Sequence, residues 1–432
     1  MSELRDRAVT LARRRLVPFL MVMYIVSFLD RANIGFAKAA LQSQVGISES
    51  TYALAAGLFF ISYSQLGFPS NLVLHKIGAR VWLSVLMVSW GLVSMATMLV
   101  TGSASFYTLR LLLGATEAGF FPGVILYLTY WFPNRVRGQI LGMFYLGVPV
   151  SMIFGSPLSG FLLEMHPAAN LSNWQWMFLV EGFLAVAVGA AAYWCLDNKP
   201  AQAPWLPPAE KQALVDALEG EAAERRGTSP AKLLATLCDM RVLQFVLIYT
   251  FIQMSVYGSV FYLPTQVSAL MNRPAGLLVG LVAAIPWVCA LCAVYWLPRV
   301  ADRAGTHRPL AALTMLVAGV AGFVFPTAGP LLGLVALSLA VAGFIGVQPL
   351  FWTFPTGYLA DRAAAGGIAM ITMGNLGGFI APNMKVWADG HFGSSHAGLY
   401  LLAGFAVLNA LLIAATGKRR AGATPVASSV HG

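Results

Sequence analysis

Twelve long apolar runs, separated by short polar gaps, constrain this chain more than any other feature of its sequence. They lie near residues 16–38, 53–75, 81–100, 105–130, 138–162, 174–196, 241–270, 276–298, 308–326, 330–358, 365–388 and 396–416. A helix rises about 1.5 Å per residue, so each run can cross about 30 Å of hydrocarbon. The sequence therefore predicts an all-α membrane protein with twelve transmembrane helices.

The composition agrees with a membrane-embedded chain and excludes a soluble one. Charged residues make up only 10% of the sequence and the mean hydropathy is +0.72, whereas soluble domains carry about 25% charged residues. The net charge of +10 does not indicate a nucleic-acid partner, because the basic residues lie in short gaps between apolar runs. Cys289 and Cys292 form a CxxC in an apolar run without a nearby histidine. We therefore expect no metal site and no cofactor.

Lysine and arginine placement predicts the orientation of the chain. If the N-terminus is cytoplasmic, 22 of the 27 basic residues lie in the N-terminal tail, in every second gap, or in the C-terminal tail. The basic residues of these gaps lie at 76–80, 135–137, 199–241, 299–308 and 362. This asymmetry predicts a multi-pass protein of the inner (plasma) membrane with both termini in the cytoplasm.

The longest polar stretch divides the predicted helices into six and six. We expect two six-helix pseudo-repeats, residues 1–196 and 241–432, joined by a cytoplasmic loop at 197–240. The loop begins with a proline-rich linker and continues as a mixed-charge helix. "HKIGAR" at 75–80 and "DRAGTHR" at 302–308 occupy equivalent places in the two halves and support the repeat.

Four charged residues lie inside predicted helices, namely Asp30, Arg31, Arg110 and Glu117. A charge at the bilayer centre costs about 2.5–3.5 kcal/mol on insertion scales, so these side chains must face the bundle interior or a water-filled cavity. They either form internal ion pairs that hold helices together or build a functional site. Two arginines in one cavity would attract an anion, and the planar guanidinium group suits a carboxylate.

The spacing of these residues distinguishes their roles. Arg110 and Glu117 are seven residues apart, so they face nearly the same way about 10 Å apart, and each needs a different partner. Asp30 and Arg31 are adjacent and point about 100° apart. Burial favours the neutral form of Glu117, whereas Arg31 favours the charged form of Asp30. Glu117 is therefore the better candidate for a group that gains and loses a proton.

Polar side chains at a similar depth extend the candidate site. Tyr63, Tyr257, Asn375 and Gln253 lie inside predicted helices, where each could contact a bound anion or simply satisfy a neighbouring helix. Glu181 lies early in its helix, near the outer face, where we expect a structural role. Glycines in "GMFYLGVPVSMIFGSPLSG" (142–160) and "GNLGGFIAP" (374–382) should let helices approach closely.

Several motifs together identify a family resemblance. They are "FLDRANIGFA" at 28–37, "RLLLGATEAGFFPG" at 110–123, "YWFPNRVRGQILG" at 130–142, "WQWMFLVEG" at 174–182, "NKPAQAPWLPPAEK" at 198–211 and "FPTGYLADRAAAGGIAMITMGNLGG" at 354–378. The chain resembles the major facilitator superfamily, and within it the anion:cation symporter family. It looks closest to the bacterial permeases for tartrate, phthalate and hydroxyphenylacetate-type acids.

The resemblance implies roles for individual residues. Arg31 and Arg110 would contact the substrate carboxylate, with Tyr63, Tyr257 and Asn375 as further substrate-binding residues. Asp30 and Glu117 would carry the coupled proton. The chain departs from the family pattern at four positions, two of which are Asn71 in place of a glycine and Gly67 in place of a glutamate. His75 replaces an acidic residue, and Lys385 replaces a small one. Lys385 could be an added anion contact or could snorkel to the membrane surface, and we expect the second.

The sequence thus predicts a secondary transporter that imports a small organic carboxylate with protons by alternating access. It would work in the lipid bilayer as a monomer. An organic anion exchanger or exporter of the same fold remains an alternative. A membrane-embedded enzyme is disfavoured because the chain has no metal-ligand cluster, nucleophile motif or nucleotide-binding loop. A sensor is disfavoured because the central loop is too short for a signalling domain.

Overall fold

The computed structural model describes residues 2–165, 171–224, 239–358 and 364–416. Within these ranges the chain forms α-helices and short 3-10 helices and no strand. The first part contains α1 (Ser2–Val45), α2 (Glu49–Ile77), α3 (Ala79–Ala96), η1 (Thr97–Leu99), α4 (Ser103–Glu117), α5 (Phe120–Trp131), α6 (Asn134–Tyr145), α7 (Gly147–Glu164) and α8 (Asn173–Cys195). After η2 (Pro200–Gln202) and α9 (Pro208–Glu224) follow α11 (Met240–Met271), α12 (Leu277–Ala304), α13 (His307–Val324), η3 (Phe325–Thr327), α14 (Pro330–Tyr358), α15 (Ala364–Thr372), η5 (Met373–Leu376), α16 (Gly377–Phe392) and α17 (Ala397–Ala415).

The membrane-spanning helices agree with the predicted fold class. In the described residues, ten helical segments are long and apolar enough to cross a membrane. The other two predicted transmembrane helices correspond to α2 and to the segment α15–η5–α16. In α2, polar residues are frequent in the last turns, and η5 divides the other run into short pieces. The chain is an all-α membrane protein with twelve helical passages, as predicted.

Three passages that the sequence predicts as continuous helices are broken. The segment 105–130 breaks between α4 and α5, 138–162 breaks at Leu146 between α6 and α7, and 365–388 breaks at η5. Pro122 and Pro149 lie in the first turns of α5 and α7, where a missing N–H removes no helical hydrogen bond. Hydrophobic runs alone do not reveal such breaks, because they continue across them.

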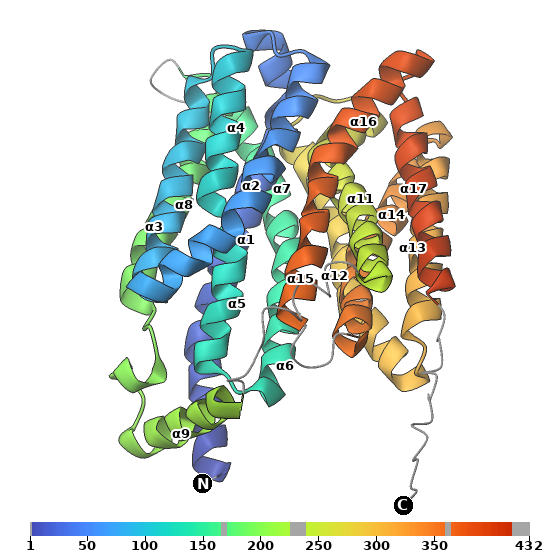
Figure 1. The fold of residues 1–432 in the computed structure, drawn as a ribbon. Helices are drawn as coiled ribbons and strands as arrows, with labels where there is room; N and C mark the ends of the chain where they lie inside the picture. Colours follow the sequence, from blue (N-terminus) through green and yellow to red (C-terminus); the bar gives the residue numbers. More distant parts are fainter. Residues whose placement is uncertain (1, 166–170, 225–238, 359–363, 417–432) are drawn as a thin grey trace, which may run out of the picture.

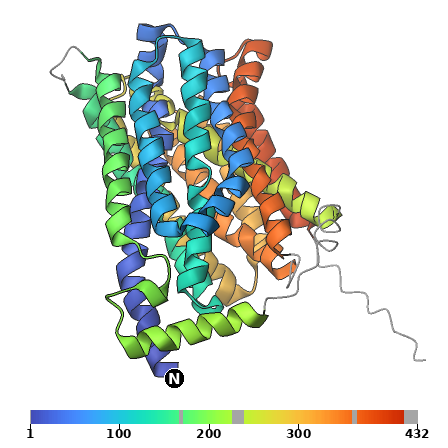
Figure 2. The same cartoon turned by 60° about the vertical axis from the view of Figure 1, so that its left-hand side comes forward.

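The two parts of the chain form two groups of helices that lie side by side (Figure 1). Helices α1–α8 lie in one group and α11–α17 in the other, and in a turned view the first group lies partly in front of the second (Figure 2). Contacts between the groups depend on glycine. A Cβ on Gly160 of α7 would lie 2.3 Å from the Gly276 oxygen, and one on Gly280 of α12 would lie 2.3 Å from the Ser156 oxygen. The predicted close approach at 142–160 is confirmed.

A cluster that we call the Tyr262 clamp connects the two helix groups and consists of Lys38, Glu49, Tyr262, Lys385 and Asp389. The ammonium groups of Lys38 and Lys385 lie 4.7 and 4.8 Å from the Tyr262 ring centroid. Each ammonium group also donates to a carboxylate of its own helix group at 2.6 Å, Lys38 to Glu49 and Lys385 to Asp389. Lys385 is only 9% exposed, so the expectation that it snorkels is wrong.

Helix α9 lies across the opposite end of the first group (Figure 1). The Trp205 ring just before α9 stacks on Trp131 at 5.5 Å, and the Arg15 guanidinium lies 5.0 Å from the Trp205 centroid. At the far end of α9, Glu221 accepts a hydrogen bond from the Asn134 N–H at 3.0 Å. The predicted mixed-charge helix of the central loop therefore packs on the first helix group.

The glycine contact between α7 and α12 leads to a stability prediction. Gly160→Ala would force a methyl group against the α12 backbone, and overpacking of this kind costs about 1–3 kcal/mol. We expect a lower midpoint of thermal unfolding in detergent. Gly142→Ala on α6 is the matched control, because nothing lies within 4 Å of its added Cβ. Equal midpoints for the two variants would contradict the close packing.

Candidate functional site

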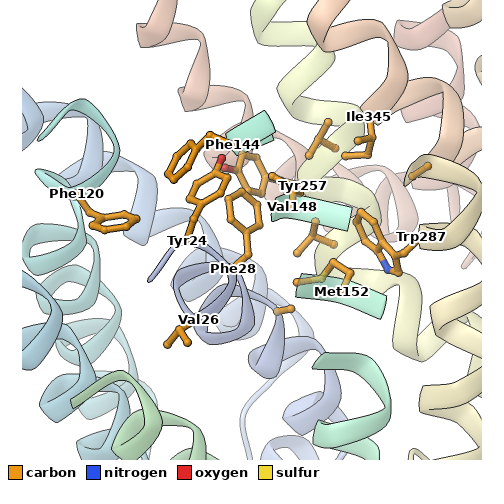
Figure 3. Packing of buried hydrophobic residues seen from close by; sticks show 14 of the residues in the cluster. Tyr24, Val26, Phe28, Phe120, Phe144, Val148, Met152, Tyr257, Trp287 and Ile345 are labelled. Atoms are coloured by element: carbon orange, nitrogen blue, oxygen red, sulfur yellow. The ribbon is translucent and has the colours of Figure 1, made fainter. Parts of the chain in front are cut away.

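A polar cavity of about 50 Å³ lies where the two helix groups meet. The first group lines it with Tyr24, Phe28, Arg31, Tyr63, Phe121, Tyr145 and Val148, and the second with Tyr249, Gln253, Val256, Tyr257, Gln348 and Asn375. Figure 3 shows Tyr24, Phe28 and Val148 facing Tyr257 in this region. Both groups contribute, so the cavity changes shape when they move relative to each other.

Helix breaks position two of the candidate residues. Glu117 is the last residue of α4, and Asn375 lies in the 3-10 turn η5. A short 3-10 stretch inside a helix often marks a functional hinge. In contrast, Arg31 and Tyr257 lie inside the long helices α1 and α11, which hold their backbones rigidly.

Arg31 and Glu117 form an ion pair buried in the protein. The Nε of Arg31 lies 3.0 Å from each carboxylate oxygen of Glu117. Their side chains are 5% and 1% exposed. Arg31 Nη1 also donates to the Tyr257 hydroxyl at 3.3 Å, which joins the two helix groups through one guanidinium. Because the pair is shielded from water, its charges interact much more strongly than surface charges do.

Aromatic rings surround the Arg31 guanidinium on its other sides. Its carbon lies 4.8 Å from the Tyr63 centroid, 4.9 Å from Phe28 and 5.4 Å from Phe59. Ring faces carry partial negative charge and therefore stabilise a cation that has lost its water. This cage holds Arg31 charged at the edge of the cavity.

Arg110 is a second buried cation near the ion pair. It is 2% exposed, and its guanidinium carbon lies 5.2 Å from the Phe59 centroid. Among the described residues, its Nε and Nη2 have no hydrogen-bond partner. A buried guanidinium with free donors is costly, so an anion that reached it would be bound tightly.

The second helix group contributes amides instead of charges. Gln253 Nε2 donates to Asn375 Oδ1 at 2.6 Å, and Gln253 Oε1 has no partner among the described residues. Gln348 lines the same wall and is 9% exposed. Amides and tyrosine hydroxyls both donate and accept hydrogen bonds. This wall can therefore bind the hydroxyl groups of a ligand whose carboxylate faces the arginines.

The structure brings most of the predicted site residues together. Arg31, Tyr63, Tyr257 and Asn375 line the cavity, and Glu117 reaches it through Arg31. Arg110 lies deeper and does not line it. Asp30 points away into the first helix group, where it accepts hydrogen bonds from Trp90 and Ser94 at 3.0 and 2.8 Å.

Sequence reasoning missed several cavity residues, which are Tyr24, Tyr145, Tyr249 and Gln348. A spacing signal existed for some of them. Tyr24 precedes Arg31 by seven residues, and Tyr249, Gln253 and Tyr257 recur every four residues on α11. Such spacings put side chains on one helix face. Among the described residues, no cluster of three or more histidine, cysteine, aspartate or glutamate side chains could hold a metal ion.

Comparison with known families decides the class of this chain. Residues 20–382 match the model of the Major Facilitator Superfamily. The chain belongs to this superfamily. The inner membrane transport protein RhmT of Escherichia coli is 45% identical, over 95% of this chain and 96% of that protein. A putative tartrate transporter of Agrobacterium vitis is 39% identical over 95% and 91%, and a quinolone resistance transporter of Acinetobacter baumannii is 37% identical over 90% of each chain.

A solved structure has the same fold. The xylose transporter XylE of E. coli, in its inward open conformation, aligns with a TM-score of 0.73 over 94% of this chain and 97% of that chain. The sequences are only 14% identical, so the likeness shows the fold alone. This member of the superfamily is therefore an integral membrane transporter and not an enzyme.

The buried ion pair leads to a prediction about stability. Glu117→Leu would leave Arg31 charged and unpaired, and breaking a buried pair costs about 3–5 kcal/mol. Adding Arg31→Leu removes the uncompensated charge, so we expect the double variant to recover much of the lost stability. Thermal unfolding of the single and double variants in detergent measures this coupling. If the stability loss of the double variant equals the sum of the losses of the two single variants, the residues do not form a pair.

Proposed function

We propose that this superfamily member is a proton-coupled symporter that imports a small hydroxylated carboxylate by alternating access. Residues 1–196 and 241–432 would be the two moving halves, joined by the loop 197–240. One chain encloses the whole cavity, which supports a monomer as the unit of transport. The observation that carries the proposal is the buried Arg31–Glu117 pair at the cavity wall.

The ion pair supplies a direct mechanism for coupling. A substrate carboxylate and the Glu117 carboxylate compete for the same guanidinium of Arg31. Protonation of Glu117 removes its charge and frees Arg31 to bind the substrate. Proton and anion then bind together, and neither stays tightly bound without the other. Asp30 is the second candidate for the coupled proton because it neighbours Arg31 in the chain.

The two walls of the cavity support the proposed substrate class. The first wall offers the Arg31 guanidinium, with Arg110 behind it, for one carboxylate. The second wall offers Gln253, Gln348 and Asn375, which suit hydroxyl groups. The relative named as a putative tartrate transporter supports a hydroxy acid of this kind. The small volume favours a ligand of few carbon atoms.

Glu117→Gln tests the coupling. Glutamine keeps the size of the side chain and cannot ionise, so it mimics the protonated state. In proteoliposomes we expect this variant to exchange labelled tartrate across the membrane but to lose accumulation driven by a proton gradient. With one coupled proton, tartrate binding to the unaltered protein should weaken about tenfold per pH unit at high pH, and the variant should lose most of this dependence.

The coupling test has a control variant on the surface of the first helix group. Gln139→Glu lies on α6, away from the cavity lining, and should leave coupling unchanged. Accumulation by Glu117→Gln at the parent rate would move the coupling role to Asp30. If the protein takes up a different hydroxy acid from a panel with the same proton dependence, only the substrate assignment is wrong and the coupling mechanism stands.

Orientation is a separate part of the proposal. With the N-terminus and α9 in the cytoplasm, the Tyr262 clamp closes the cavity from the outside. In a variant without native cysteines, we expect a cysteine at Ser43, on the same end as the clamp, to react with a membrane-impermeant thiol reagent in intact cells. A cysteine at Glu219 on α9 should react only after the cells are permeabilised. The reverse pattern would overturn the orientation.

An exporter is the alternative that one observation favours. A relative at 37% identity is named as a quinolone resistance transporter. The same proteoliposomes decide between the two, because an exporter would drive ciprofloxacin efflux and would not accumulate tartrate. The two arginines near the cavity favour an anionic substrate, whichever way it is transported.

A further inference from the structure

One helix of the second group begins without a cap of its own. The residue before α12 is Gly276, which has no side chain, and the first turn of α12 contains no acidic residue. The first N–H groups of a helix have no partner within that helix, and they give this end a partial positive charge. The carboxylate of Glu164, the last residue of α7, accepts a hydrogen bond from the Leu277 N–H at 2.9 Å. The first group therefore supplies the cap that α12 lacks.

The backbone before α12 leaves a space that the Glu164 side chain fills. A Cβ on Gly276 would lie 2.2 Å from Glu164 Oε1, and the three atoms nearest to it all belong to the Glu164 side chain. Gly160, whose added Cβ would meet the Gly276 oxygen, lies four residues before Glu164 and therefore on the same face of α7. We call Glu164, Gly276 and Leu277 the Glu164 latch.

The latch lies at the same end of the molecule as the Tyr262 clamp. The segment α6–α7 starts beside α9, where Asn134 contacts Glu221, and it finishes at Glu164 at the opposite end. Helix α1 also starts near α9 and carries Lys38 of the clamp close to its other end. The latch joins α7 to α12, whereas the clamp joins α1 and α2 to α11 and α16. Both sets of contacts thus hold the two helix groups together at the end opposite α9.

Both sets of contacts can separate without leaving a buried charge unpaired. In the clamp, Lys38 pairs with Glu49 of its own helix group, and Lys385 pairs with Asp389 of its own helix. Separation of the groups would break the contact of Lys38 with the Tyr262 ring but neither ion pair. In the latch, the capping residue is exposed, so water can replace the hydrogen bond that its carboxylate loses. This end of the molecule is therefore held closed by contacts that can be made and broken repeatedly.

We propose that the Glu164 latch is a releasable contact that determines how often the end opposite α9 opens. In the closed arrangement, the carboxylate of the first group stabilises the N-terminus of α12. When the groups separate, the carboxylate and the N–H groups both become hydrated. A contact that exists in only one of two arrangements shifts their populations by its own free energy. For a helix cap, the ratio of open to closed molecules changes by about fivefold.

The latch rests on the alternating access proposed above, but it involves neither a proton nor a particular substrate. Distances between pairs of spin labels therefore test it in the purified protein, with no substrate and no gradient. In a variant without native cysteines, labels at Ser43 on α1 and Ser395 before α17 report the latch end. Labels at Gln139 on α6 and Thr306 before α13 report the α9 end. All four positions are exposed.

The first variant is Glu164→Ala, which removes the cap. At the latch end, we expect the ratio of long to short distances to rise about fivefold. At the α9 end, the short distances should become more frequent, because the groups move as two bodies. Unchanged distances at both ends would overturn the proposal. A change at the latch end alone would also overturn it, because the start of α12 would then only fray.

Gly276→Ala opens the latch in a second way and keeps the proposal testable if Glu164→Ala does not fold. Its methyl group displaces the carboxylate without removing it. This variant should shift the distances as Glu164→Ala does, and the double variant should shift them no further, because both changes act on one contact. Glu164→Gln keeps an acceptor oxygen but loses the charge, so its shift should lie between. Additive shifts in the double variant would contradict the latch.

Arg273→Gln is the matched control. Arg273 is an exposed charged residue four positions before Leu277, and its side chain forms no ion pair or hydrogen bond with the described residues. This variant changes the charge at the latch end and should leave both distances unchanged. A shift equal to that of Glu164→Ala would show a general effect of charge and would overturn the latch. If the unaltered protein shows no proton-driven uptake, the proposed function fails, while the distances still decide whether Glu164 holds this end closed.

Discussion

The ion pair between Arg31 and Glu117 is the interaction on which the rest of the site depends. Neither charge can be buried alone, so α1 and the end of α4 must lie close enough for Arg31 Nε to contact both carboxylate oxygens of Glu117. Rings of Phe28, Phe59 and Tyr63 then shield the guanidinium from water. Shielding makes the pair strong, and it also makes the pair sensitive, because a single proton on the carboxylate cancels its attraction for the cation.

The two halves of the molecule divide the chemistry between them. Charged groups near the cavity come from the first half, whereas the second half contributes neutral amides and hydroxyls such as Gln253 and Tyr257. Under the proposed mechanism, a substrate bound to both walls would draw the halves together, and only the first wall would respond to a proton. Under the same mechanism, substrate selectivity would change through the second half without disturbing the coupling in the first.

The sequence predicted the fold well because each signal is local. A run of apolar residues predicts a membrane helix wherever the run later packs, and a single buried charge indicates a polar interior. Ion pairs between helices cannot be predicted from such local signals. Glu117 lies 86 residues after its partner Arg31, and no spacing rule connects them. Sequence reasoning did not identify Tyr24 and Gln348 as cavity residues for another reason. A lone tyrosine or amide in an apolar run is common in membrane helices, so only the assembled cavity distinguishes these two from structural residues.

Helix breaks connect the site to movement. Glu117 ends α4 and Asn375 lies in η5, so the residues that contact Arg31 and Gln253 stand at the weakest points of their helices. A continuous helix would resist any rotation of these side chains, because each hydrogen bond along its backbone would have to stretch. At a break the backbone already departs from the regular helix, so the Glu117 side chain can shift at a smaller cost to the helix that follows. The tight glycine contacts between α7 and α12 are the opposite case, because there the two helix backbones are packed too closely for local adjustment.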